Sequence, residues 1–191
     1  MAGRQAKIIS EETYKDLLIF AATTRHPVRN KLIVQLSVKA GLRAGEIANL
    51  TWDMVVGPTG ELGPPIELPD SAAKKFSGRL IPVHPDVRAS LHIWQTLIDP
   101  TGPLILSERG GPMTAVSIVN WFAAAYRAIG AAGCSSHSGR RTFITRAARL
   151  VHKVGGSLRD VQLLAGHRSI QTTQRYIDGD TDAQRKLVAM I

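Results

Sequence analysis

A stretch of short β-prone runs interrupts a chain that is otherwise patterned for helices. Runs rich in strand-forming residues occupy 52–56, 65–68 and 79–83, and turn-forming or polar segments separate them. Helical patterns lie on both sides, at residues 10–24, 28–40, 44–50, 85–97, 114–130, 138–152, 157–165 and about 181–190. We therefore expect a mixed, mainly α fold with a small three-stranded antiparallel sheet inserted after the third helix.

The composition is that of a globular domain. Of 191 residues, 44% are hydrophobic and 20% are charged, which supplies a core and excludes general disorder. The sequence has neither an apolar run of 18 residues nor an apolar segment behind its basic start, so we expect no membrane span and no secretory signal. The one cysteine, Cys134, cannot close an intrachain disulfide or build a multi-thiolate metal site. A single domain, residues 1–191, in the cytoplasm is the prediction.

The net charge indicates a polyanionic partner. Lys and Arg number 24 against 15 acidic residues, a formal net charge of +9, and 16 of the 24 are Arg. A guanidinium binds phosphate through two parallel hydrogen bonds, whereas an ammonium acts as a point charge. Residues 134–191 carry 10 basic and 4 acidic side chains, so +6 of the net charge lies in the last third of the chain. Nucleic acid is the partner that this pattern favours, and a basic surface of no consequence is the alternative.

Four segments contain residues that could act on a phosphodiester. They read GLRAGEI from Gly41, KKFSGRLIP from Lys74, HSGRRTF from His137, and GHRSIQTTQRY up to Tyr176. Taken singly they are weak evidence, because an Arg three places after a His arises by chance roughly 0.5 times in such a sequence. Their order and flanking residues resemble the catalytic domain of the tyrosine recombinases, the phage integrase family. The resemblance covers about residues 10–176 and a short tail, and it implies the catalytic fold of that family of DNA breaking-rejoining enzymes.

Covalent cleavage of DNA requires a nucleophile, positive charge on the phosphate and an acid for the leaving oxygen. The resemblance implies that Tyr176 attacks phosphorus to form a 3′-phosphotyrosyl bond, while Arg43 and Arg140 clamp the non-bridging oxygens. Two guanidinium groups supply the charge that other phosphoryl-transfer enzymes take from metal ions, so we expect no cofactor and no metal. Arg141 is one place out of the family pattern, and we assign it to structure or to a backbone contact.

Two histidines and a lysine complete the expected site. Either His137 or His167 can donate to phosphate or accept the tyrosine proton, because histidine titrates near neutrality. The resemblance favours His137 as the acid–base partner of Tyr176 and His167 as a donor to the phosphate. It also implies that Lys74 protonates the departing 5′-oxygen, with the adjacent Lys75 as the alternative.

Other residues of these segments have expected structural roles. Glu46 lies one helical turn after Arg43 and is in reach of its guanidinium. Gly41 and Gly166 are expected to end helices. Gly139 stands where the family often has a leucine between the paired His and Arg.

The function that the resemblance implies is site-specific recombination or integration, in which double-stranded DNA is cleaved and rejoined without metal by a tetrameric synapse. A type IB topoisomerase with the same chemistry is one alternative, and a DNA-binding regulator without turnover is another. Six intact catalytic positions argue against the regulator. The family's N-terminal core-binding domain is expected to be absent, residues 177–191 are expected to form a short C-terminal tail, and the expected setting is a bacterial or phage-derived, nucleoid-associated protein.

Overall fold

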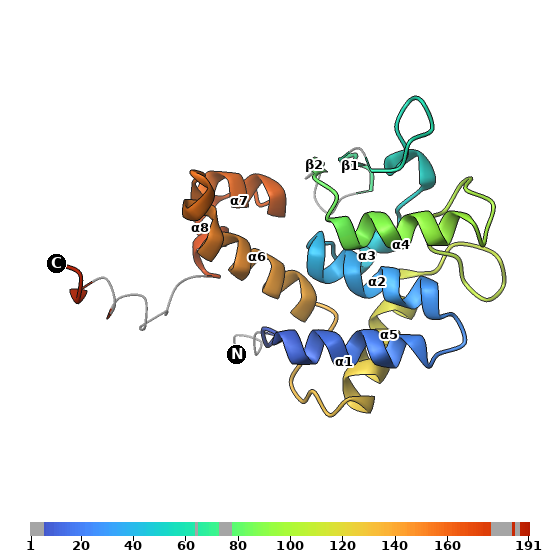
Figure 1. The fold of residues 1–191 in the computed structure, drawn as a ribbon, viewed down its shortest axis with the longest axis horizontal. Helices are drawn as coiled ribbons and strands as arrows, with labels where there is room; N and C mark the ends of the chain where they lie inside the picture. The colour runs from blue at the N-terminus through green and yellow to red at the C-terminus, as the bar shows by residue number, and fades with distance from the viewer. Residues whose placement is uncertain (1–5, 64, 73–77, 177–184, 186–187) are drawn as a thin grey trace. The chain divides into compact units, whose positions relative to one another are not determined.

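The computed structural model describes residues 6–63, 65–72, 78–176, 185 and 188–191 (Figure 1). The chain forms two compact units, which divide between Phe143 and Ile144. Within the described residues, every helix is too short or too polar to span a bilayer.

The first unit contains five helices that the sequence predicts to within two residues at each end. They are α1 (Glu11–Ala22), α2 (Pro27–Lys39), α3 (Ala44–Ala48), α4 (Pro85–Gln95) and α5 (Ala115–Ala128). Their starts follow capping chemistry. The hydroxyls of Ser10 and Thr114 each accept the backbone N–H three residues on, at 3.0 Å and 3.1 Å. Pro27 and Pro85 occupy first helical positions, where a missing N–H has no cost.

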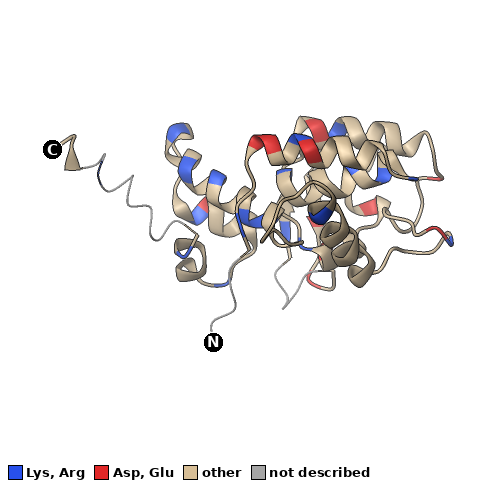
Figure 2. Cartoon of the chain, turned by 90° about the horizontal axis from the view of Figure 1, so that it is seen from below, with Lys and Arg blue, Asp and Glu red and all other residues tan. Residues whose placement is uncertain are grey.

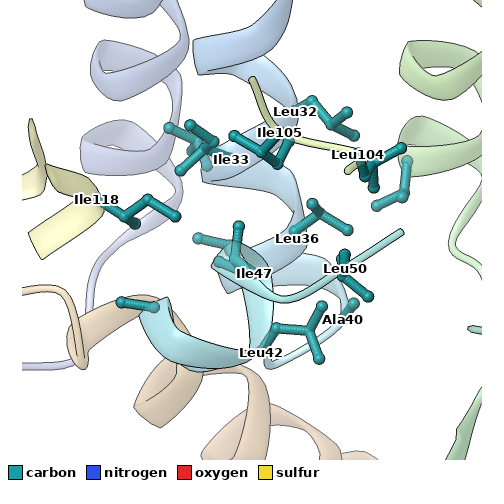
Figure 3. Close-up of a cluster of buried hydrophobic side chains, with 14 of the residues drawn as sticks. Leu32, Ile33, Leu36, Ala40, Leu42, Ile47, Leu50, Leu104, Ile105 and Ile118 are labelled. Atoms are coloured by element: carbon teal, nitrogen blue, oxygen red, sulfur yellow. The ribbon is translucent and has the colours of Figure 1, made fainter. Parts of the chain in front are cut away.

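The core of the first unit surrounds α2, which packs against α1, α3 and α4. Figure 3 shows aliphatic side chains of α2 meeting others from the α2–α3 loop, α3 and two later segments. The labelled side chains are fully buried, and each leucine or isoleucine among them contributes about 1.5–3 kcal/mol through removal from water. The labelled members are Leu32, Ile33, Leu36, Ala40, Leu42, Ile47, Leu50, Leu104, Ile105 and Ile118.

The sheet has two strands in the described part of the chain, so the prediction of three is wrong. β1 (Ile66–Leu68) pairs antiparallel with β2 (Arg79–Ile81). The expected first strand at 52–56 contains instead a 3₁₀ turn, η1 (Trp52–Met54). Its burial explains the difference, because Trp52 and Val55 both face the core. A spacing of three residues is the period of a 3₁₀ helix, whereas a strand would bury alternate residues.

The second unit is helical. α6 (Ser138–Leu150) begins in the first unit and continues into the second, where η2 (Val151–Val154), α7 (Leu158–Ala165) and α8 (Ile170–Gln174) follow. α6 and α7 confirm two predicted helices. α8 was not predicted, since it has five residues and two β-branched threonines of low helix propensity. The helix predicted at 181–190 and the tail predicted at 177–191 lie largely outside the described residues.

Candidate active site

A buried carboxylate, Glu46, lies within ion-pair distance of three arginines of the first unit. Its side chain is 1% exposed. The backbone N–H of Arg43 donates to Oε2 at 2.9 Å, and Nη1 of Arg43 donates to Oε1 at 2.6 Å. The sequence dictates this contact, because Arg43 is the N-cap of α3 and Glu46 is the third residue of its first turn. The predicted pairing of the two side chains is confirmed.

Arg79 on β2 makes a second, two-pronged contact with Glu46. Its Nη1 and Nη2 donate to the two carboxylate oxygens at 3.1 Å and 3.0 Å, and its side chain is 4% exposed. Paired parallel hydrogen bonds of this kind are the strongest that a guanidinium makes. Arg79 was not among the site residues predicted from the sequence. Strand alternation in the sequence puts Arg79 on the same face as Ile81 but does not say which face is buried. In the structure Leu80 is 61% exposed, so Arg79 faces inward.

Arg140 reaches the same carboxylate from α6. It is 3% exposed, its Nη1 donates to the Gly41 carbonyl at 2.6 Å, and the same nitrogen lies 3.9 Å from Oε2 of Glu46. Arg43 and Arg140, which the sequence places almost 100 positions apart, therefore share one counterion. The structure brings these two predicted residues together.

The ionisation of Glu46 is set by these neighbours. Burial by itself raises the pKa of Glu46, but the hydrogen bonds and positive charges of Arg79 and Arg43 outweigh it and lower the pKa to about 2. The carboxylate is therefore ionised at neutral pH. Three guanidinium groups around one carboxylate leave the cluster with an excess of positive charge, which suits an anionic ligand.

Gly41 permits the approach of α6 to this cluster. Its φ is +66°, and a Cβ there would lie 2.3 Å from Cδ1 of Phe143. Both features exclude side chains at this position. Gly41 follows the C-cap of α2, as predicted, and its carbonyl is the acceptor for Arg140.

A cavity of about 370 Å³ lies beside the cluster, within the size range of small-ligand sites. Arg43 and His137 both line it, together with residues of α3 and the start of α5. His137 is exposed and directly precedes α6, whose Arg141 N–H donates to the His137 carbonyl at 2.9 Å. Arg140 is not among the described residues that line the cavity. Arg141 donates through Nη1 to the Ala6 carbonyl at 3.0 Å, in keeping with a structural role.

The second unit places His167 against Tyr176. Their rings stack with centroids 5.5 Å apart and planes 24° apart. α7 ends at Gly166, whose φ of +61° turns the chain as predicted, and His167 follows at once. Nδ1 of His167 lies 2.9 Å from the Thr173 hydroxyl. The structure thus brings two further predicted residues together.

Tyr176 is the most accessible of the three tyrosines. It is half-buried, whereas Tyr14 and Tyr126 are 5% and 2% exposed. Burial, with a smaller contribution from Cys134, raises the pKa of Tyr126 far above the ordinary value of a phenol. The burial of Tyr14 and Tyr126 disfavours both as nucleophiles, which leaves Tyr176 as the candidate.

Lys74 and Lys75 lie outside the described residues. Among the residues that are described, no three His, Cys, Asp or Glu side chains gather into a group able to hold a metal ion.

Comparison with known proteins gives one consistent result. A model of the phage integrase family matches residues 7–182. Tyrosine recombinase XerC of Mesorhizobium japonicum is 30% identical over 165 residues, which cover 80% of this chain and 47% of that protein. The crystal structure of XerA recombinase has a TM-score of 0.73 at 24% identity, covering 96% of this chain and 64% of that one. A lambda integrase tetramer bound to a Holliday junction has a TM-score of 0.69 at 19% identity, covering 89% and 47%.

These matches define first a class and then a family. The fold is that of tyrosine recombinase catalytic domains. The chain belongs to the phage integrase family, since the family match covers all but its first six and last nine residues. This confirms the resemblance carried by the four sequence segments. The chain spans about half the length of the curated XerC relative.

Proposed function

We propose that this chain is the catalytic domain of a site-specific recombinase or integrase, which cleaves and rejoins double-stranded DNA through a 3′-phosphotyrosyl bond. The observation that carries the proposal is the arginine cluster. Glu46 orders two arginines at the family's catalytic positions, and Arg43 lines a cavity together with His137. The named relatives are tyrosine recombinases, and the lambda integrase neighbour is bound to a Holliday junction.

The proposed reaction is a transesterification that conserves bond energy. The Tyr176 oxygen attacks phosphorus, the bond to the 5′-oxygen breaks, and a 3′-phosphotyrosyl bond forms. Arg43, Arg140 and His167 neutralise the charge that develops on the non-bridging oxygens. His137 accepts the tyrosine proton, and Lys74 donates a proton to the leaving 5′-oxygen.

Rejoining is the reverse reaction with the 5′-hydroxyl of another strand. It needs no external energy, because the phosphodiester bond is held as the phosphotyrosyl link. We propose that four copies of the protein assemble on DNA for strand exchange, and that both units belong to one catalytic domain.

The second unit supports the proposed DNA contact through its charge. Residues 144–176 contain six Lys and Arg and a single acidic residue, Asp160. Figure 2 shows that the charged segments of its helices are mostly blue. Such a surface attracts the phosphate backbone without regard to sequence.

A suicide substrate tests the proposal without a known target. The substrate is a pool of duplexes with a randomised centre, nicked so that the short 5′-hydroxyl fragment diffuses away after cleavage. We expect wild-type protein to be trapped covalently on DNA and Tyr176→Phe to give no adduct while binding DNA within a few-fold of wild type. A wild-type protein that binds the pool but never forms an adduct would contradict the proposal and favour a DNA-binding regulator.

Two refinements use sequences recovered from the adducts. A 5′-bridging phosphorothiolate leaves without a proton, so it should rescue Lys74→Ala, whereas rescue of Lys75→Ala would reassign the acid. Supercoiled plasmids with two copies of the recovered site should be converted to recombinant products. Relaxation without exchange would indicate a topoisomerase.

A further inference from the structure

The Thr173 hydroxyl is completely buried beside the imidazole of His167. Thr173 is 0% exposed, and its Oγ1 lies 2.9 Å from Nδ1 of His167. Within the described part of the chain, that ring nitrogen is the one hydrogen-bond partner of the hydroxyl. The residue sits in α8, between the histidine and Tyr176 in sequence, and Thr172 before it is exposed.

A neutral imidazole has two tautomers, and this hydroxyl can distinguish them. If Nδ1 carries the proton, it donates to Oγ1, and the buried threonine O–H is left without an acceptor among the described residues. An unsatisfied buried donor has a large desolvation cost. If Nδ1 is bare, the threonine O–H donates to it and the requirement is met. The burial of Thr173 therefore favours the tautomer protonated at Nε2.

The backbone of His167 is held independently of its ring. Nε2 of Gln162 donates to the His167 carbonyl at 2.8 Å, and the His167 N–H donates to the Gln162 carbonyl at 3.1 Å. Gln162 is 3% exposed and accepts a hydrogen bond from Nη1 of Arg159 at 2.9 Å. The backbone is thus fixed at His167, and Thr173 and the stack on Tyr176 both act on the orientation of its ring.

We propose that Thr173 is a positioning residue that holds neutral His167 in its Nε2-protonated tautomer. In this state the Nδ1 lone pair is occupied by Thr173, and Nε2 can only donate. Resting on the proposed function, this makes His167 a fixed donor to the scissile phosphate. It also removes His167 as a base for the Tyr176 proton, although the two rings are in contact, and leaves that role to His137.

Nitrogen NMR measures the tautomer directly and needs no DNA substrate. The full chain is labelled with ¹⁵N-histidine, and the two ring nitrogens are observed at pH 8, above the ordinary titration range of histidine. A His167→Asn variant assigns the signals, and exposed His152 serves as the reference for an unconstrained ring. We expect His167 to show a single tautomer, protonated at Nε2, in wild type and in Thr172→Val. In Thr173→Val, it should become a mixture like that of His152.

The conservative variants link the tautomer to the reaction. Thr173→Val should slow covalent adduct formation about tenfold, the order expected for a lost hydrogen bond at a buried site. Thr173→Ser should restore both the NMR signature and the rate, whereas Thr173→Ala, which lacks the same methyl group, should restore neither. This Ser and Ala pair keeps the comparison valid even if the valine variant does not fold.

Two results would overturn the proposal: an unchanged His167 tautomer in the hydroxyl-free variants, or a changed tautomer with an unchanged rate. Failure of the proposed function would look different. Wild type would then form no adduct at all, while the NMR comparison would still decide the role of Thr173.

Discussion

The charged carboxylate of Glu46 pairs with three arginines. Because this pairing requires an ionised carboxylate, the stability of the first unit depends on pH. Its pKa is about 2 in the folded chain, against an ordinary value of 4.5. A depressed carboxyl pKa contributes stability that is fully present above pH 4.5 and is lost as the pH falls toward 2. We expect the free energy of unfolding to fall more steeply across this window in wild type than in Glu46→Gln.

Urea unfolding followed by circular dichroism at a series of pH values measures this difference. Glu67→Gln, a change of the same kind on the exposed side of β1, should leave the wild-type curve unchanged. If the free energy of unfolding depends on pH in the same way in wild type and in Glu46→Gln, the arginine cluster does not stabilise the charged carboxylate.

A substitution at Arg79 tests whether the arginine cluster contributes to catalysis as well as to stability. Arg79→Lys keeps the charge but loses the two-pronged contact, so Glu46 should hold Arg43 and Arg140 less firmly. We expect adduct formation to slow by about tenfold or more, with DNA affinity within a few-fold of wild type because the Arg79 side chain is buried. Arg88→Lys on the exposed side of α4 is the matched control. A normal cleavage rate in Arg79→Lys would separate the cluster from catalysis.

The three arginines of this cluster differ in how far their contacts could be predicted from the sequence. The contact of Arg43 with Glu46 was predictable, since residues three apart at a helix start share a face. Arg79 was not, because its role depends on the inward face of β2, and a one-residue change of register reverses that face. The burial of Arg140 and its hydrogen bond to Gly41 depend on how α6 packs, which local sequence does not specify.

At the scale of helices, the first turn of α6 lies so close to α2 that Gly139 has no room for a side chain. A Cβ there would lie 2.3 Å from Oγ of Ser37 and 3.1 Å from Cγ2 of Val38. The absence of a side chain at Gly139 is therefore matched to Ser37 and Val38 of α2. We expect Gly139→Ala to lower the free energy of unfolding by about 1–3 kcal/mol, the usual cost of overpacking.

A double-mutant cycle with Ser37→Ala checks this expectation by urea unfolding. Removing the serine oxygen should recover part of the loss, giving a favourable coupling energy. Gly45→Ala in α3 is the control, because its Cβ would meet nothing within 4 Å, and it should be neutral or stabilising. Strictly additive effects of the Gly139 and Ser37 changes would contradict the contact.

Element boundaries were predictable where capping residues mark them, as at Ser10, Thr114 and Gly166. The failures have physical causes. Strand-forming side chains at 52–56 were assigned to a sheet, but the burial of Trp52 and Val55 three residues apart favours a 3₁₀ turn. α8 is too short to produce a helical pattern of its own.

For the whole molecule, the proposed chemistry takes its positive charge from arginine. Arg43 and Arg140 place the positive charge on the phosphate, so adduct formation should continue in excess EDTA at a rate close to that in magnesium. An endonuclease with paired metal ions, added to the same substrate, should stop under chelation and serves as the positive control. Loss of adduct formation in EDTA that Mg²⁺ or Mn²⁺ restores would contradict the proposed mechanism.

The most direct test of the central claim is to identify the residue that becomes bound to DNA. The trapped adduct is digested with nuclease and trypsin, and the peptide that carries the 3′-nucleotide is sequenced by mass spectrometry. We predict that the nucleotide lies on Tyr176, that Tyr176→Phe yields no modified peptide, and that Tyr126→Phe, which removes a buried hydroxyl with no partner among the described residues, yields the wild-type result. A nucleotide on any other residue would contradict the account.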